Sequence, residues 1–595
     1  MLLLKKQSLF LLFLLLFASC GKNSTEIETK TTEKQSSNKL YFGGDILTMQ
    51  NKEYPNYAEA VVQNGGKIIF VGKLDNAKKM YPNAEQIDLN GKTLIPGFID
   101  SHSHISQTAV KLSTVSLDPP PAGNVSSIDE LISKLKKALE ENPDHYNKPK
   151  AWLTGWGFDN GMLTEQRFPT RKDLDEVSTE IPICIIHFSS HIIVMNSKGL
   201  EISGYLSPDY KNPEGGSIRL ENGEPNGVIE EQAALFGLTK MGEDTTGKKG
   251  IYTGIQLPKE EMLKYLLEAQ ELYLSEGYTT ITDLATTTTE YNYISKLGKE
   301  GKLKADVSMV FYAAATTPDI VDSLYSKEYT NGYRVAGGKL NLDGGSPGRT
   351  AYLREPYYTP TPGQPKSYRG YSSIKDQKDM NTLVDSYYSR EIPFFIHALG
   401  DAAVDQCIEA VSYAEKNNGY KDARTNLIHL QQVQLDQFEK MKSQDVTLTF
   451  QITHNYYFGD YHHDVIYGPE RTQRLNPIGD AYKDGFSVTF HHDSPVHPVD
   501  QIFIMWIASN RKSRTGKVYG SDQLLTPYQS LYASTAEAAY QLKEENHKGS
   551  LSVGKLADMV ILDRNPLKID KDAIKDISVL ETIKEGTTVF KNKKH

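Results

Sequence analysis

Two histidines stand two residues apart in the segment PGFIDSHSHI, residues 96–105, directly after an apolar run and a Pro-Gly pair. The surrounding run KTLIPGFIDSHSH has the apolar content of a β-strand, and side chains two apart in a strand point to the same side. We therefore expect His102 and His104 to emerge together from the end of this strand, where two ring nitrogens suit one metal ion. The alternative for a lone pair of this spacing is two solvated loop histidines, so the metal interpretation needs further ligands elsewhere.

The composition is that of an ordinary globular protein large enough for more than one domain. The chain has 595 residues, a net charge of −9 and a hydrophobic fraction of 38%. No basic stretch is large enough to suggest nucleic-acid binding, so we expect no nucleic-acid partner. A homodimer is compatible with the sequence.

The N-terminal residues 1–20, MLLLKKQSLFLLFLLLFASC, combine two lysines with an apolar run that is short for a membrane span. The ending Ala18-Ser19-Cys20 resembles a bacterial lipobox, although Phe17 stands where Leu is usual. We therefore expect a lipoprotein-type signal peptide, a lipid on Cys20, and a flexible tether over the polar residues 21–39. This predicts an extracytoplasmic protein anchored to a membrane of the bacterial cell envelope. The alternative is a cleaved signal and a free secreted protein.

Both ends of the remaining chain are rich in β-strand signals. Residues 40–93 and residues 549–595 alternate apolar and polar positions between Gly-rich turns. Neither part has enough strands for a core of its own. We therefore predict one small β-sandwich built from both chain ends.

Eight strand-like runs, separated by helical stretches, recur between these ends. They predict an α/β fold, a (β/α)8 TIM-like barrel over residues 94–548, whose active site should lie at the carboxyl ends of the strands. A long stretch after the first strand, about 105–260, has its own strand and helix patterns and is expected to be an inserted α/β subdomain. The eight runs cover residues 94–104, 278–285, 305–314, 334–345, 392–401, 425–432, 445–454 and 486–495.

Polar residues fall at the expected ligand-bearing ends of these runs. His397 ends the fifth run, His429 the sixth and Asp493 the eighth. Lys339 lies within the fourth run, and Asp343 follows it in the same alternation phase. A single histidine on an apolar strand is usually a hydrogen-bonded core residue, but this repeated placement favours a common site.

Several phrases together resemble the metal-dependent amidohydrolase superfamily, and more narrowly amidohydrolase family 3, which includes N-substituted formamide deformylases. The resemblance covers nearly everything from about residue 40 to the end. The phrases are IPGFIDSHSH, TGWGFD, MNSKGL, GEPNGVIEE, LDGGSPGRTA, IHALGDAAV, HHDSPV and GSLSVGKLADMVILDRNP.

The resemblance implies that His102, His104, His397 and His429 are ligands of one metal centre. It makes Asp493 the last-strand carboxylate that touches the metal and moves the proton, and it aligns Lys339 with a position that is carbamylated in some members. The sequence departs from the family at three positions, since Ile428 replaces an acidic residue and His491 and His492 replace small residues.

Neutral imidazoles and a carboxylate suit Zn²⁺, as one or two ions, although other divalent transition metals fit the same ligand types. A metal there would activate water and polarise a carbonyl, which predicts hydrolysis of the C–N bond of a small N-acyl or N-formyl amide. Asp493 would act as general base and then as general acid. A hydrolytic deaminase with the same metal set is the alternative within enzymes, and a degenerate, non-catalytic binding lipoprotein is the alternative outside them.

Lys339 and Trp156 each have two possible interpretations. Lys339 is either a carbamate that bridges two metals or a strand-end lysine paired with Asp343. In the insertion, Trp156, His191 and Glu231 are predicted to contact substrate, while Trp156 is equally explained as part of the core of the insertion.

Overall fold

The fold is that of a computed structural model of the chain. It describes residues 38–120, 122–146, 151–189, 192–212, 216–231, 233–234, 257–361 and 364–593. The chain divides into residues 1–37 and residues 38–595, and the second unit contains everything described below. The predicted signal peptide, nearly all of the predicted tether, and Cys20 therefore lie outside the described residues, as does His191.

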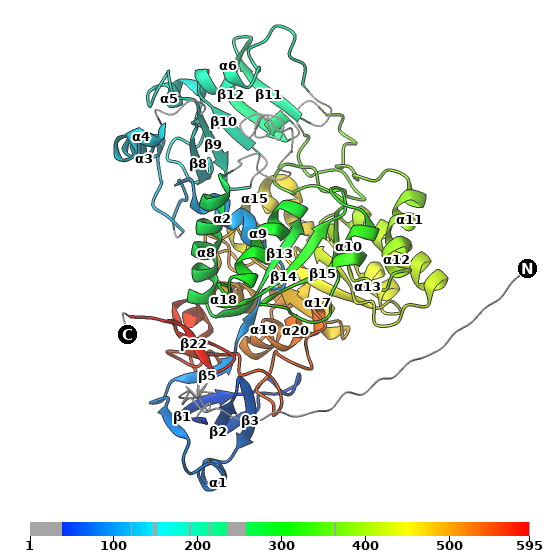
Figure 1. The fold of residues 1–595 in the computed structure, drawn as a ribbon. Helices are drawn as coiled ribbons and strands as arrows, with labels where there is room; N and C mark the ends of the chain where they lie inside the picture. Colours follow the sequence, from blue (N-terminus) through cyan, green and yellow to red (C-terminus); the bar gives the residue numbers. More distant parts are fainter. Residues whose placement is uncertain are drawn as a thin grey trace, which may run out of the picture. The chain divides into compact units, whose positions relative to one another are not determined.

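A sheet of eight parallel strands forms the centre of this unit (Figure 1). Its order, β6-β13-β14-β15-β16-β17-β18-β19, follows the chain, as the eight sequence runs predict. The strands are β6 (Phe98–Ile99), β13 (Tyr278–Thr286), β14 (Asp306–Tyr312), β15 (Tyr333–Asn341), β16 (Phe394–Ala398), β17 (Thr425–His429), β18 (Val446–Phe450) and β19 (Val488–Phe490).

Hydrogen bonds beyond the first and last strands bring the two edges of this sheet together. The Ser101 hydroxyl donates to the Phe490 carbonyl at 2.6 Å, and the His104 amide donates to the Ser494 carbonyl at 2.9 Å. The parallel strands thus close in the manner of a TIM barrel, and the chain leaves each strand toward the same end.

Helices alternate with these strands, and their ends carry the expected capping residues. Thr287 and Glu290 form a capping box at the start of α9, and α12 ends at Gly419, whose φ of 62° is readily adopted by glycine. The helices around the barrel include α8 (Lys259–Ser275), which precedes β13, then α9 (Thr288–Lys299), α10 (Pro318–Leu324), α11 (Gln377–Tyr388), α12 (Asp401–Asn418), α13 (Leu435–Met441), α17 (Ile478–Lys483), α18 (Gln501–Asn510), α19 (Pro527–Ala533) and α20 (Ala536–Gln541).

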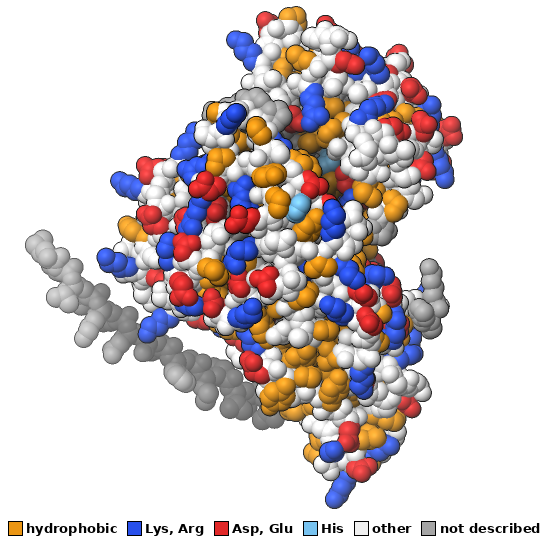
Figure 2. All heavy atoms as spheres, turned by 180° about the vertical axis from the view of Figure 1, so that it is seen from behind, with side chains coloured by type: hydrophobic (Ala, Val, Ile, Leu, Met, Phe, Trp, Pro, Cys, Tyr) orange, Lys and Arg blue, Asp and Glu red, His pale blue; other side chains and the backbone are white. Residues whose placement is uncertain are grey.

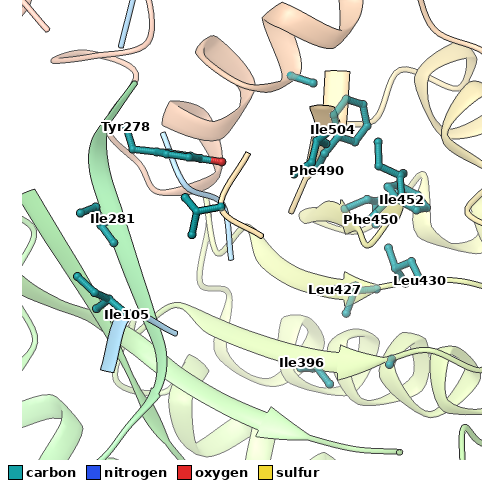
Figure 3. Packing of buried hydrophobic residues seen from close by; sticks show 14 of the residues in the cluster. Ile105, Tyr278, Ile281, Ile396, Leu427, Leu430, Phe450, Ile452, Phe490 and Ile504 are labelled. Atoms are coloured by element: carbon teal, nitrogen blue, oxygen red, sulfur yellow. The ribbon is translucent and has the colours of Figure 1, made fainter. Parts of the chain in front are cut away.

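A large hydrophobic cluster packs between the strands and their helices. Figure 3 shows part of it, with Ile281 on β13, Ile396 on β16 and Leu427 on β17. Each of these three side chains is fully buried. Burial of such a side chain contributes about 1.5–3 kcal/mol, so this packing fixes the strands whose ends form the site.

The run that the sequence analysis interpreted as one first strand forms two strands. Strand β5 (Thr93–Pro96) pairs antiparallel with β20 (Met559–Leu562), and only β6 joins the barrel. Gly97 separates them, and a Cβ there would lie 2.3 Å from Thr279 Oγ1. His102 and His104 lie in the turn after β6, so strand alternation does not place them; His104 instead immediately precedes α2 (Ile105–Leu112).

Strands from both chain ends share one eight-stranded sheet. The order is β22-β21-β20-β5-β1-β2-β3, with β4 paired to β1. That the two chain ends form a small β-sandwich stays a prediction. The N-terminal members are β1 (Lys39–Leu47), β2 (Tyr57–Asn64), β3 (Lys67–Gly72) and β4 (Glu85–Asp88), with α1 (Leu74–Met80) after β3; the C-terminal members are β20, β21 (Val579–Lys584) and β22 (Thr587–Lys591).

A third sheet lies within the range where the sequence predicted an insertion. It has six strands in the order β11-β12-β10-β9-β8-β7 and a hydrophobic cluster of its own. Its elements are β7 (Val115–Ser116), α3 (Ile128–Glu141), α4 (Pro143–Tyr146), β8 (Leu153–Phe158), α5 (Arg171–Asp175), β9 (Ile183–His187), β10 (Ile192–Met195), α6 (Ser197–Ile202), β11 (Gly216–Glu221) and β12 (Glu224–Glu231).

The surface carries charges of both signs. Figure 2 shows Lys and Arg side chains interspersed with Asp and Glu over the face that it presents. Among the described residues, none of the helices combines the length and the apolar character that a membrane crossing requires.

Candidate metal centre

The two histidines after β6 meet the aspartate after β19. His102 Nε2 lies 2.9 Å and His104 Nε2 lies 3.3 Å from Asp493 Oδ1. All three side chains are buried, and their donor atoms are close enough together to hold one ion. The first and last strands of the barrel therefore contribute to a single cluster, as the sequence predicted.

Asp493 is held in an unusual backbone conformation. Its φ is 58°, in the left-handed region that Asp and Asn tolerate better than most residues. The turn is fixed on both sides, since the Ser494 amide donates to His492 Nδ1 at 2.9 Å and the Ser494 carbonyl accepts from the His104 amide. Sparsely populated backbone conformations of this kind concentrate at functional sites.

His429 and His397 bring the fifth and sixth strands into the cluster. Their ring centroids are 4.2 Å apart, and the His429 ring lies 5.1 Å from that of His102. His429 also has a positive φ, 78°, at the last residue of β17. The four histidines predicted as ligands are therefore gathered at one end of the barrel.

Gln451, directly after β18, connects two of these groups. Its Oε1 lies 3.1 Å from His429 Nδ1, and its Nε2 donates to Asp493 Oδ2 at 3.0 Å. The contact with Oε1 fixes the proton of His429 on Nδ1 and leaves Nε2 for the centre. Gln451 was not among the predicted site residues, and its position directly after the seventh strand is the signal that could have identified it.

Asp343 lies beside His397 rather than pairing with Lys339. Its carboxylate lies 3.3 Å from His397 Nδ1 and accepts backbone amide hydrogens from Leu399, Gly400 and Tyr352 at 2.9–3.0 Å. A carboxylate behind a histidine ligand is a common means of orienting the ring.

Lys339 is buried inside the barrel, with its Nζ 3.2 Å from His102 Nε2. The alternative of a strand-end lysine paired with Asp343 is therefore wrong. Burial lowers the pKa of Lys339 to about 7, and Asp493 opposes this effect only in part. A substantial fraction of the amine is consequently neutral near pH 7.

The other groups have the protonation states that metal ligation needs. Burial lowers the pKa of His102 and of His429 well below the ordinary histidine value, so both rings are neutral. Burial alone would raise the pKa of Asp493, but the neighbouring His102, His104 and His429 lower it well below its usual range. Neutral imidazoles around an ionised carboxylate are the form in which these residues bind a cation.

The structure also places His491, which the sequence noted only as a departure from the family. Its ring centroid lies 4.6 Å from that of His102 and 4.8 Å from that of His429. The donor atoms of His429, His491 and Asp493 form a second close group. His491 precedes Asp493 by two positions, a spacing that resembles that of the first pair.

The predicted substrate contacts are less fully described. Trp156 is completely buried, in the large hydrophobic cluster that also includes barrel residues. Glu231 ends β12, and its side chain lies outside the described part of the structure, as does the whole of His191. The roles predicted for these three residues stay predictions.

Comparison with known proteins identifies a family for most of the chain. The family model described as "Amidohydrolase family" matches residues 85–590. N-substituted formamide deformylase of Arthrobacter pascens is 24% identical over 542 residues, which cover 89% of this chain and 94% of the relative. The Arabidopsis thaliana protein LONG AFTER FAR-RED 3 is 25% identical over 569 residues, covering 93% and 91% of the two chains.

A solved structure agrees with these sequence matches. An uncharacterized metal-dependent hydrolase from Pyrococcus horikoshii OT3 superposes with a TM-score of 0.69 at 26% identity, covering 90% of this chain and 99% of that one. The likeness extends over nearly the whole of both chains and includes the barrel.

Proposed function

Since this chain belongs to the amidohydrolase family, we propose that it hydrolyses the C–N bond of a small N-acyl or N-formyl amide with the help of a divalent metal. The observation that carries the proposal is the position of Asp493 Oδ1, 2.9 Å and 3.3 Å from two imidazole nitrogens at the carboxyl end of the barrel. An active site of a TIM barrel lies at that end.

The residues present fit a metal ion. His429 Nε2 is buried and has no hydrogen-bond partner among the described residues, although it faces the other ligands. Such an orphaned nitrogen is costly unless a cation binds it. We propose that His102, His104, His397, His429 and Asp493 hold Zn²⁺, as one or two ions. Bound there, Zn²⁺ would polarise the amide carbonyl and make water acidic near neutral pH.

Asp493 is the group that moves protons in this proposal. Being ionised and buried beside the ligands, it accepts the proton of the attacking water and then donates it to the leaving nitrogen. Gln451 holds Oδ2 in place, so that Oδ1 faces the histidines. The Asp343 carboxylate lies 3.3 Å from His397 Nδ1, on the side of the ring away from Nε2.

We assign Lys339 the role of a carbamate that adds a negative charge to the centre. Formation of a carbamate requires a neutral amine and CO₂, and a pKa of about 7 supplies the amine. The distance of 3.2 Å between Lys339 Nζ and His102 Nε2 supports a position for the modified group among the ligands.

We also propose the substrate class and the location of the protein. The Arthrobacter relative is named for deformylation of N-substituted formamides, which supports an N-formyl or N-acyl substrate here. The lysine-flanked apolar run that ends at Cys20 supports a lipid anchor on the outer side of a bacterial membrane.

A screen of N-formyl and N-acyl amines tests the reaction. The zinc-loaded protein should release amine, and the same protein treated with a chelator should release none. Release of ammonia from ring amines or amidines, without release of substituted amines, would instead establish a deaminase. Absence of both activities in protein that binds metal would contradict the proposed hydrolysis.

A further inference from the structure

His491 is a buried histidine whose ring nitrogens lack hydrogen-bond partners among the described residues. It follows β19 directly, after Phe490, which Figure 3 shows among the buried apolar side chains. Its exposed fraction is 1%. A polar group buried in this way destabilises the fold unless something binds it.

The neighbours of the His491 ring include several groups of the metal centre. The His102 ring lies 4.6 Å away and the His429 ring 4.8 Å away, and His491 forms a compact donor group with His429 and Asp493. No neighbouring imidazole satisfies it, because neither ring nitrogen of His491 has a hydrogen-bond partner among the described residues. A cation is the partner that would satisfy these nitrogens together.

His492 shows that this orientation is particular to His491. The ring of His492 lies against two tyrosines, with Tyr273 at 5.8 Å and Tyr278 at 5.7 Å between centroids. Its Nδ1 accepts a hydrogen bond from the Ser494 amide at 2.9 Å. Two adjacent buried histidines thus have different surroundings, and of the two it is His491 that joins a group of metal-binding donor atoms.

We infer that His491 is an additional metal ligand, which with His429 and Asp493 forms a second ligand group beside that of His102, His104 and Asp493. The inference rests on the proposed metal centre and extends it, since the family resemblance places a small residue at this position. A further nitrogen donor would strengthen metal binding and fill a position that water would otherwise occupy.

Replacement of His491 by cysteine gives a direct test. A thiolate binds Co²⁺ through sulfur and produces a thiolate-to-cobalt charge-transfer band in the near ultraviolet. The metal-free full-length variant His491→Cys, titrated with Co²⁺, should develop this band. The matched variant His492→Cys should not, because that side chain faces the tyrosines. The wild type corrects for Cys20 and for the buried Cys184 and Cys407.

His491→Leu separates ligation from packing. It should bind Co²⁺ and Zn²⁺ at least about tenfold more weakly than the wild type in competition with a chelator, since even a residue that only supports a ligand is worth that much. Its metal-free form should melt no lower than the wild type, because leucine removes an unsatisfied buried group. A packing role would instead lower the melting temperature of the metal-free form and leave the metal affinity unchanged.

The outcomes distinguish this inference from the proposed function. If His102→Ala/His104→Ala loses the metal while His491→Leu binds it as tightly as the wild type and His491→Cys shows no band, His491 is not a ligand and the proposed centre stands. If the double alanine variant also binds metal normally, the proposed centre itself is wrong. A charge-transfer band in His491→Cys together with weakened binding by His491→Leu would support the inference.

Discussion

Asp493→Asn should separate metal binding from proton transfer at this centre. Asparagine tolerates the φ of 58° and preserves one carbonyl oxygen, so the turn should survive. The amide nitrogen then creates a conflict, because Oδ2 of Asp493 now accepts from Gln451 Nε2 at 3.0 Å. Rotation of the Gln451 amide would relieve it, but Gln451 Oε1 is already engaged with His429 Nδ1 at 3.1 Å.

The structure sets the size of both effects. Two amide donors that face each other without an acceptor cost about 1–3 kcal/mol. The single variant should therefore bind metal roughly 5- to 150-fold more weakly. Loss of a positioned acid–base group should lower kcat by about 10²–10⁴, or roughly 2.7–5.4 kcal/mol in the barrier. Adding Gln451→Glu supplies a carboxylate that accepts both from the new side-chain amide at position 493 and from His429, which should restore much of the metal affinity.

The assay measures metal content by mass spectrometry and amine release on the same preparations of wild type, Asp493→Asn and Asp493→Asn/Gln451→Glu. We expect the double variant to regain metal without regaining turnover. Near-normal turnover by the single variant would remove Asp493 from proton transfer. Recovery of turnover together with metal in the double variant would show that Asp493 acts through geometry alone.

Four other perturbations test separate parts of the molecule. His102→Ala/His104→Ala should lose most of the bound metal and all activity, measured on one preparation. Lys339 is buried, and its pKa is lowered from 10.5 to about 7, so between pH 7 and pH 10.5 the unfolded chain binds more protons than the folded chain. The free energy of unfolding of the metal-free protein should therefore rise with pH across that window. This rise should be smaller in Lys339→Met. Deletion of residues 549–595 removes β20, β21 and β22 and exposes β5, so the truncated chain should be insoluble or readily proteolysed, and a folded, active product would contradict this. Cys20→Ser should move the protein from the membrane fraction to the soluble fraction, and unchanged detergent partitioning would exclude the lipid anchor.

The barrel was predictable because its strands are buried apolar runs. In β16, Phe394, Phe395 and Ile396 are consecutive, apolar and buried, and such a run is recognisable without knowledge of its neighbours. The proposed ligands His397 and His429 and the aspartate Asp493 were recognisable for the same reason, since each interrupts or follows an apolar run at the end where barrels place their active sites.

The features that the sequence did not predict depend on tertiary pairing. The run from Thr93 to Ile99 reads as one strand, but its first half pairs with β20, more than four hundred residues later, and its second half with β13. His491 and His492 are adjacent and identical in the sequence, which does not show which of the two side chains faces the metal centre. Their different directions follow from the turn at Asp493, where the Ser494 amide binds His492. That contact joins residues only two apart, but it depends on the φ of 58° at Asp493, which the sequence alone does not specify.

The protonation states of these side chains explain why the centre combines histidines with an aspartate. A divalent cation in a buried site requires negative charge nearby, because an uncompensated charge in a medium of low polarity is expensive. His102 and His429 are neutral, so Asp493 supplies the negative charge in both groups of donor atoms described above. A carbamate on Lys339 would supply a second and would remove the positive charge that the amine carries below a pKa of about 7. A buried lysine 3.2 Å from His102 Nε2 opposes cation binding when protonated and favours it once carbamylated, so metal binding and modification of Lys339 should each promote the other.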